Sequence, residues 1–163
     1  MTLEQLLEAL HLGERQDIEF KAADGGLPRS LWETVSAFAN TDGGTLVLGV
    51  AERDGGFVVE GVRKPDALLK AFWDGHHNSQ KLNQPLCREA DVAVMLLDQH
   101  KVVCIHVPRA TRQQRPVFIN GNPLLGTYKR NYEGDYRCTE AEVRQMLRDA
   151  SDEAQDLQIF EGF

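Results

Sequence analysis

The chain has 163 residues, of which 42% are hydrophobic and 26% are charged, and its formal net charge is −7. The length fits one domain with a sizeable core, and the composition is that of a soluble globular protein, expected in the cytoplasm. No apolar run approaches the roughly 20 residues of a membrane span, so no membrane contact is expected. The three cysteines lack C-x-x-C spacing, which argues against a disulfide framework.

The first quarter of the chain predicts a helix, a strand and a second helix. A capping box at residues 2–5 precedes leucines at helical spacing, which indicates a helix over 2–10. Polar and apolar residues alternate over 17–21, as in a half-buried strand. A proline at a favoured first-turn position then predicts a helix over 28–40.

The stretch SAFANTDGGTLVLGV, residues 36–50, joins the second helix to an apolar strand over 45–50. In phosphate loops the glycines precede a helix, whose positive end then faces the anion. Here the helix comes first, so its carbonyl end faces the turn, and the chain has no G-x-x-x-x-G-K-[ST]. We therefore expect no P-loop. Gly43 or Gly44 should instead adopt a left-handed conformation and let the helix and strand pack closely.

The remaining elements follow from apolar spacing and turn residues. In chain order they are a turn at 55–56 leading to a strand over 57–59, a helix over 65–73, a hairpin of strands 91–97 and 101–107, a polar loop over 110–115, strands over 117–119 and 124–129, and a helix from a capping box at 139 to about 150. This order predicts an α+β fold, a single domain over 1–150 with one mixed β-sheet flanked by helices. Residues 151–163 form an acidic tail, compatible with a further domain downstream.

Several acids lie near the ends of two predicted strands, namely Glu14, Glu19, Glu52 and Asp54. If those strands are neighbours, the carboxylates could hold Mg²⁺ or Mn²⁺ and support hydrolysis of phosphodiesters. The alternative, which spacing alone favours, is that the acids are solvated or that Glu19 pairs with a basic residue such as Lys21. A zinc site is not favoured, because the histidines and cysteines match no compact zinc template.

Basic residues gather in one segment of this acidic chain. Residues 101–137 carry a charge of +5, which leaves −12 for the rest. This asymmetry suits a one-sided contact with a polyanion, although charge alone favours a solvated arginine-rich loop. The candidates for contacts with phosphates, and a tyrosine for stacking on bases, are Arg109, Arg112, Arg115, Lys129, Arg130, Tyr132 and Arg137.

Three stretches together resemble the Schlafen AlbA-like domain family. They are ERQDIEFK at 14–21, the glycine-pair stretch at 36–50 and GTYKRN at 126–131. The resemblance spans about residues 3–150. It implies an α+β fold related to the Alba chromatin proteins and a DNA-binding module of bacterial transcriptional regulators and RecG-like helicase-related proteins. The implied partner is nucleic acid, DNA more than RNA, with a homo-oligomer as a further expectation and no cofactor.

Animal Schlafen relatives are similar and include endoribonucleases that use three acids with a divalent metal. Two of these acids match Glu14 and Glu19 in E-x-x-x-x-E-F-K. The third is expected where this chain has Ala51, which cannot bind metal, so Glu52 or Asp54 would have to replace it. The leading hypothesis is therefore a non-catalytic nucleic-acid-binding domain of a regulator. The alternatives are an endonuclease dependent on Mg²⁺ or Mn²⁺, with Glu14, Glu19 and Glu52 as catalytic residues, and a protein-interaction module.

Overall fold

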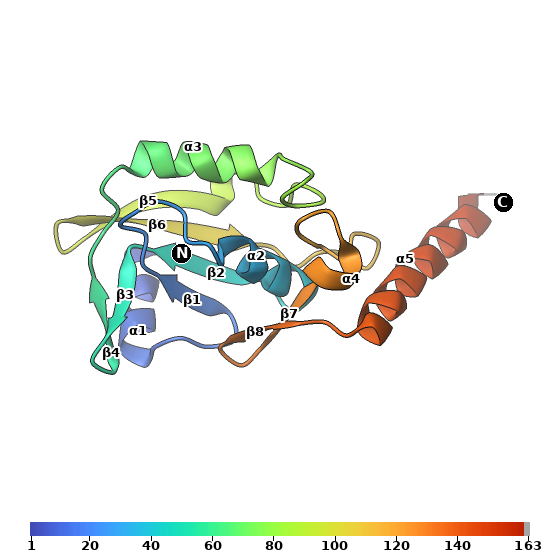
Figure 1. Ribbon diagram of the computed structural model, residues 1–163, viewed down its shortest axis with the longest axis horizontal. Helices are drawn as coiled ribbons and strands as arrows, with labels where there is room; N and C mark the ends of the chain where they lie inside the picture. The colour runs from blue at the N-terminus through green and yellow to red at the C-terminus, as the bar shows by residue number, and fades with distance from the viewer. Residues whose placement is uncertain (162–163) are drawn as a thin grey trace.

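A four-stranded sheet in the order β1-β2-β6-β5 forms the centre of the fold (Figure 1). The parallel pair is β1 (Ile18–Lys21) with β2 (Gly44–Leu48). The long strand β6 (His100–Val107) is antiparallel both to β2 and to the edge strand β5 (Val92–Leu97), which follows the short 3-10 helix η1 (Glu89–Asp91). The predicted mixed sheet is thus confirmed, but it does not hold all the strands, because two further two-stranded sheets are present. The computed structural model describes the backbone of residues 1–161 and the side chains of residues 1–152.

Helices cover both faces of this sheet. On one face, α2 (Leu31–Asn40) and α3 (Pro65–His76) bury a cluster that includes Leu46 and Ile105. On the other face, α1 (Leu3–Leu12) packs in a second cluster with the alternate strand residues, such as Val47. The central strands are therefore buried on both faces, as their unbroken apolar runs predict. No described helix combines the length and apolar character needed to cross a membrane.

The corner between α2 and β2 is closely packed, as the glycine pair predicts. Gly43 has a φ of 75° and donates its N–H to the carbonyl of Phe38 at 2.7 Å. A Cβ at Gly44 would lie 2.6 Å from the ring of Phe38. Larger residues would push α2 away from the sheet, so the glycines are required by packing and by backbone conformation.

The apolar run over 45–50 is not one strand, which corrects the sequence prediction. It breaks at Gly49, whose φ is 108° and whose carbonyl accepts the N–H groups of Glu60 and Gly61 at 2.9 and 2.8 Å. A side chain at Gly49 would meet the backbone of Gly61. The chain can therefore leave the sheet here and form a separate hairpin of β3 (Val50–Arg53) and β4 (Gly56–Val59).

The segments after β6 also differ from prediction. Residues 117–119 make only isolated bridges, and the predicted strand over 124–129 begins instead as the one-turn helix α4 (Pro123–Gly126). The reason is local, because the side chain of Asn122 caps this turn by accepting the N–H groups of residues 124 and 125. The chain then forms a third hairpin of β7 (Tyr128–Asn131) and β8 (Gly134–Arg137).

The last helix, α5 (Glu140–Glu161), begins at the predicted capping box and runs past residue 150. The sequence contains no glycine or proline between 140 and 161, so nothing in it ends the helix earlier. It projects from the body of the molecule (Figure 1). Most of the predicted tail is thus helical, while positions 162 and 163 lie outside the described residues. The expected domain boundary and downstream domain stay predictions.

Candidate functional site

Arg130 lies at the junction between the β7–β8 hairpin and the start of β1. Its side chain is 1% exposed. The guanidinium donates hydrogen bonds to five acceptors, which are the carbonyls of Arg15, Gln16 and Ile18 and the carboxylates of Glu19 and Asp135. It also lies 5.0 Å from the centre of the Phe38 ring.

This burial does not fit the role of phosphate contact that the sequence predicts for Arg130. All three guanidinium nitrogens donate to acceptors inside the protein, and the neighbouring Glu19 and Asp135, both 2.9 Å away, balance the charge. Strand alternation explains the placement, because Arg130 and Asp135 face each other on the inner side of the hairpin. Arg130 is therefore a structural residue that fixes the hairpin to the sheet.

Glu14 and Glu19 are close together, as the sequence predicts. Glu14 accepts the N–H of Phe20 at 3.1 Å. Partial burial, followed by the adjacent Glu19 carboxylate, raises the pKa of Glu14 from 4.5 to about 8. Glu19 bonds to Arg130 at 2.9 Å and lies 3.6 Å from the ammonium of Lys21. The pairing of Glu19 with basic residues is thus the interpretation that the structure bears out.

Glu52 and Asp54 do not join this pair to make a metal site. Both acids are exposed on the β3–β4 hairpin, and only Glu52 lines a surface hollow of about 520 Å³ together with Glu14. Among the described residues, no three acids, histidines or cysteines are arranged to hold a metal ion. With Glu19 engaged by Arg130 and no third acid converging on Glu14, the described residues do not assemble a site for a divalent cation.

Zinc fits no better. His76 is buried and its Nε2 accepts the N–H groups of Leu86 and Cys87, both at 2.9 Å, so this nitrogen is not free for a metal. Burial lowers the pKa of His76 to about 4 and raises the pKa of Cys87 to about 12. His76 therefore acts as a neutral acceptor that ties the loop before η1 to the end of α3.

Two of the other basic candidates pair with acids of α5. Lys129 of the hairpin pairs with Glu142 at 2.7 Å, in the first turn of the helix, and Arg112 of the loop after β6 pairs with Asp149 at 3.7 Å. These two helix positions are seven residues apart, or roughly 10 Å along the axis. Three predicted contact residues form no ion pair with an acid of the described part of the chain. They are Arg109, Arg115 and Arg137.

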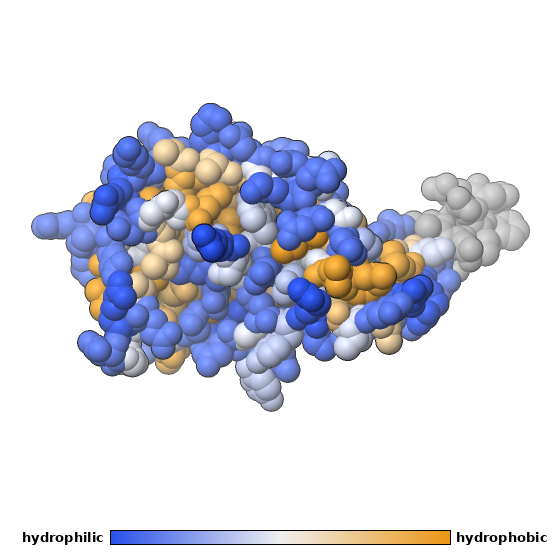
Figure 2. Space-filling model, in the orientation of Figure 1, coloured by the Kyte–Doolittle hydropathy of each residue, from blue (hydrophilic) through white to orange (hydrophobic). Residues whose placement is uncertain are grey.

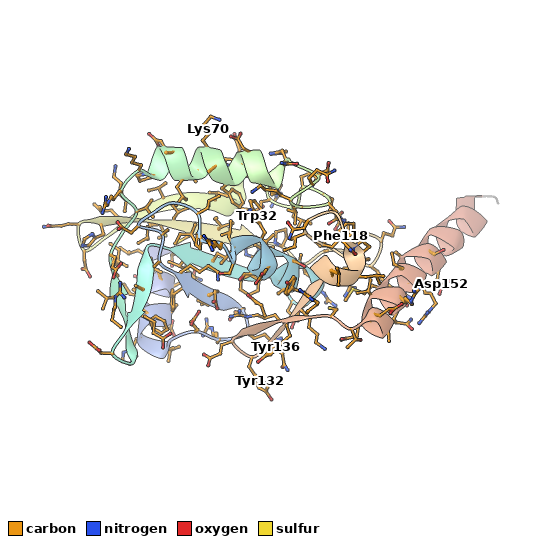
Figure 3. All side chains as sticks on the ribbon, in the orientation of Figure 1. Trp32, Lys70, Phe118, Tyr132, Tyr136 and Asp152 are labelled. Atoms are coloured by element: carbon orange, nitrogen blue, oxygen red, sulfur yellow. The ribbon has the colours of Figure 1, made fainter. Side chains whose placement is uncertain are left out.

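Two tyrosines stand on the outer side of the β7–β8 hairpin. Tyr132, at the turn, is 78% exposed and has a φ of 56°, and Tyr136 is 54% exposed. Tyr132 points away from the body of the protein (Figure 3), and the ring of Tyr136 lies over Gly134 of the same strand. The register places Tyr136 opposite Lys129. The sequence predicts Tyr132 as the stacking residue, and Tyr136 belongs to the same basic segment with its aromatics; the alternation of inward and outward residues along the hairpin explains why Tyr136 is exposed as well.

Comparison with known proteins agrees with this architecture. Residues 14–139 match the family model described as Schlafen, AlbA_2. The N-terminal domain of a RecG-related protein from Nitrosomonas europaea is 28% identical, with a TM-score of 0.60, over 83% of this chain and 92% of that chain. The DIP2311 protein from Corynebacterium diphtheriae shares the fold at 19% identity and a TM-score of 0.58.

The match to DIP2311 covers 90% of this chain but only 28% of that protein. A search of curated proteins gave no match. The family model, in contrast, spans both the paired acids of β1 and the β7–β8 hairpin. The resemblance noted in the sequence is confirmed, and this chain belongs to the Schlafen, AlbA_2 family.

Proposed function

We propose that this domain binds nucleic acid, with DNA as the expected polymer, through the β7–β8 hairpin and the loop over 109–115. The observation that carries the proposal is the exposure of Tyr132 and Tyr136, 78% and 54%, with Lys129 beside Tyr136 on the outer side of the hairpin and Arg137 exposed at the end of β8. We call this set of four residues the tyrosine hairpin.

The chemistry of the tyrosine hairpin suits unpaired bases. Aromatic rings in water have no packing partner, and stacking on a base supplies one whatever the base is. Lys129 lies on the same face of the hairpin as Tyr136, where its positive charge can contact the phosphates between stacked bases, and Arg137 lies at the end of β8. The loop over 109–115 adds three arginines, and Arg112 among them reaches Asp149 of α5.

The comparisons support this direction. The Nitrosomonas protein is described as related to RecG and to ATP-dependent DNA helicases, and its matching part is an N-terminal domain. A module that contacts DNA through exposed tyrosines and arginines would suit the N-terminal domain of a helicase-related protein. We extend the proposal to a regulatory role in transcription, which the family resemblance implies.

The test is fluorescence anisotropy with labelled single-stranded DNA, duplex DNA and single-stranded RNA of equal length, across a salt series. We expect the strongest binding to single-stranded DNA at low salt, with affinity falling steeply as salt rises. Absence of binding to all three polymers at the lowest salt would refute the proposal, as would an affinity that does not change with salt.

Replacing both tyrosines, Tyr132→Ala with Tyr136→Ala, should weaken binding by roughly 5- to 150-fold for each stack that is lost, since each stacked base contributes about 1–3 kcal/mol. The matched control is Lys70→Gln on α3, at the opposite side of the molecule from both tyrosines (Figure 3). The control should bind as the wild type does. Equal losses in both proteins would mean that the hairpin is not the contact surface.

The other two hypotheses have less support. A metal-dependent nuclease would need Glu19 free of Arg130 and a third acid that converges on Glu14, whereas Glu52 lines the same hollow as Glu14 without completing a group of three ligands among the described residues. Cleavage of structured RNA in Mn²⁺ by the wild type but not by a Glu19→Gln variant would revive it. A protein-interaction module becomes the better proposal if both the binding and the cleavage assays are blank.

A further inference from the structure

The outer edge of β5 carries unpaired backbone groups. The carbonyl of Lys101 accepts the N–H of Val62 at 2.8 Å, so Lys101 directs its backbone groups away from β5, and its neighbour Leu96 directs its own toward the open edge. Hydrogen-bonded and non-bonded pairs alternate along an antiparallel ladder. The backbone groups of Val92 and Val94 therefore also point toward the open edge. No backbone hydrogen bond from the described residues reaches these three residues from outside.

This edge lacks the usual protection against pairing. The strand VAVMLL has no charge and no proline, and it ends the sheet beside β6 (Figure 1). Val94 is 43% exposed and Leu96 is 64% exposed. The acid just before the strand is turned inward, since Asp91 accepts the N–H of Arg88 at 2.7 Å and its side chain is 8% exposed. An extended strand can therefore approach the edge without meeting a charge.

A second copy of β5 is the partner that fits this edge by symmetry. Two identical strands that run antiparallel across a two-fold axis offer each other the same donors and acceptors. If the axis passes beside Val94, then Val94 faces Val94 of the second copy and Val92 faces Leu96. The outward backbone groups of all three residues then form hydrogen bonds with the second copy. In this register Asp91 faces Leu97 and Asp98 faces Ala90. No acid then faces an acid, which matters for a chain with a net charge of −7.

We propose that two copies of this protein associate through β5 in this register, so that their sheets join into one. The inference is independent of nucleic-acid binding, because β5 and the tyrosine hairpin belong to different sheets. The dimer would present two tyrosine hairpins, one from each copy.

Cross-linking tests the register. Under mild oxidation, Val94→Cys should form a covalent dimer, because facing residues of a hydrogen-bonded pair lie about 5.5 Å apart, within the range for a disulfide. Leu96→Cys alone should form no covalent dimer, since the two copies of residue 96 would be separated by about 14 Å. The double variant Val92→Cys with Leu96→Cys should cross-link again. The three native cysteines are buried and stay in all variants.

Sedimentation velocity tests the surface without cross-linking. The wild type should dimerise with increasing concentration, and Val94→Lys should be monomeric with an unchanged circular dichroism spectrum and melting temperature. The control is Leu125→Lys in a different apolar patch, where Leu124, Leu125 and Leu147 gather over α4 and the start of α5 (Figure 2). A monomeric wild type would overturn the proposal, as would a dimer that is dissociated by Leu125→Lys but not by Val94→Lys. Binding of an unrelated strand-forming peptide at β5, with no self-association, would overturn it too.

Discussion

At the scale of single residues, the buried charges decide which side chains can contact a ligand. Arg130 has the appearance of a surface residue in the sequence, where it stands beside Lys129 in a polar segment. In the structure the two side chains lie on opposite faces of β7. Arg130 points inward to Glu19 and Asp135, and Lys129 points outward to Glu142. The basic segment therefore contributes fewer phosphate contacts than its count of charges suggests.

Removing the buried charge should destabilise the fold. Arg130→Met leaves Glu19 and Asp135 without their partner, so we expect the free energy of unfolding to fall by about 3–5 kcal/mol. The measurement is urea denaturation at neutral pH. The exposed Arg137→Met is the control and should change the stability by no more than about 0.5 kcal/mol. Similar small effects in both variants would show that the buried ion pairs are not required.

Glu14 should give the stability a specific dependence on pH. Its pKa is about 8 in the folded protein and 4.5 in the unfolded chain, so between these values the folded state binds the extra proton. The stabilising contribution is complete below pH 4.5 and is lost as the pH rises through 8. Glu14→Gln should remove this loss, whereas Glu8→Gln on the exposed side of α1 should keep it. Parallel stability curves for Glu14→Gln and the wild type would contradict the assignment.

At the scale of elements, glycines decide where the chain turns and where it leaves the sheet. Gly44 packs against the ring of Phe38, and Gly49 ends β2 and starts the β3–β4 hairpin. The first effect follows from the order of helix, glycines and strand in the sequence. The second could not be predicted, because Gly49 lies inside an apolar run and its partners, Glu60 and Gly61, come from the far side of the hairpin.

Adding a single methyl group tests the corner. In Gly44→Ala the new Cβ would lie 2.6 Å from the Phe38 ring, so we expect a loss of about 1–3 kcal/mol from overpacking. Gly25→Ala is the matched control, since nothing lies within 4 Å of the new Cβ and the backbone conformation is ordinary. The measurement is the melting temperature of both variants, which should fall for Gly44→Ala and stay unchanged for Gly25→Ala. An unchanged melting temperature for Gly44→Ala would mean that the corner is loosely packed.

At the scale of the whole molecule, charge is unevenly placed on an acidic protein. The hairpin and the loop over 109–115 carry exposed arginines, while the net charge of the chain is −7. Binding to a polyanion should therefore be local, modest and sensitive to salt.

The salt dependence should report how many phosphates the loop contacts. Replacing Arg109, Arg112 and Arg115 by glutamine should reduce the slope of log affinity against log salt by about 2, at about 0.7 per lost contact with a single strand. The control replaces Lys64 and Lys70, at the start of α3 and within it, and should leave the slope unchanged. An unchanged slope in the loop variant would restrict the contact surface to the hairpin.

Much of the fold was open to prediction, and part of the candidate site was not. Apolar periodicity and capping boxes identify α1, α2, α3, the β5–β6 hairpin and the start of α5, because those signals are local. The segment over 117–131 is different. Asn40 of α2 accepts the N–H of Val117 and donates to the carbonyls of Val117 and Tyr128, and such long-range contacts leave no periodic signal.

By itself, the sequence determined the family, the α+β class, the glycine corner and the proximity of Glu14 and Glu19, because each rests on local spacing or on a compact motif. Only the tertiary structure decided what these residues can do. Packing of β7 against β1 turns Arg130 into the partner of Glu19, and the break at Gly49 carries Glu52 and Asp54 onto a separate hairpin. The same packing leaves Tyr132 and Tyr136 in solvent. The physical reason is that burial and charge pairing depend on segments more than 100 residues apart, such as Glu19 and Arg130.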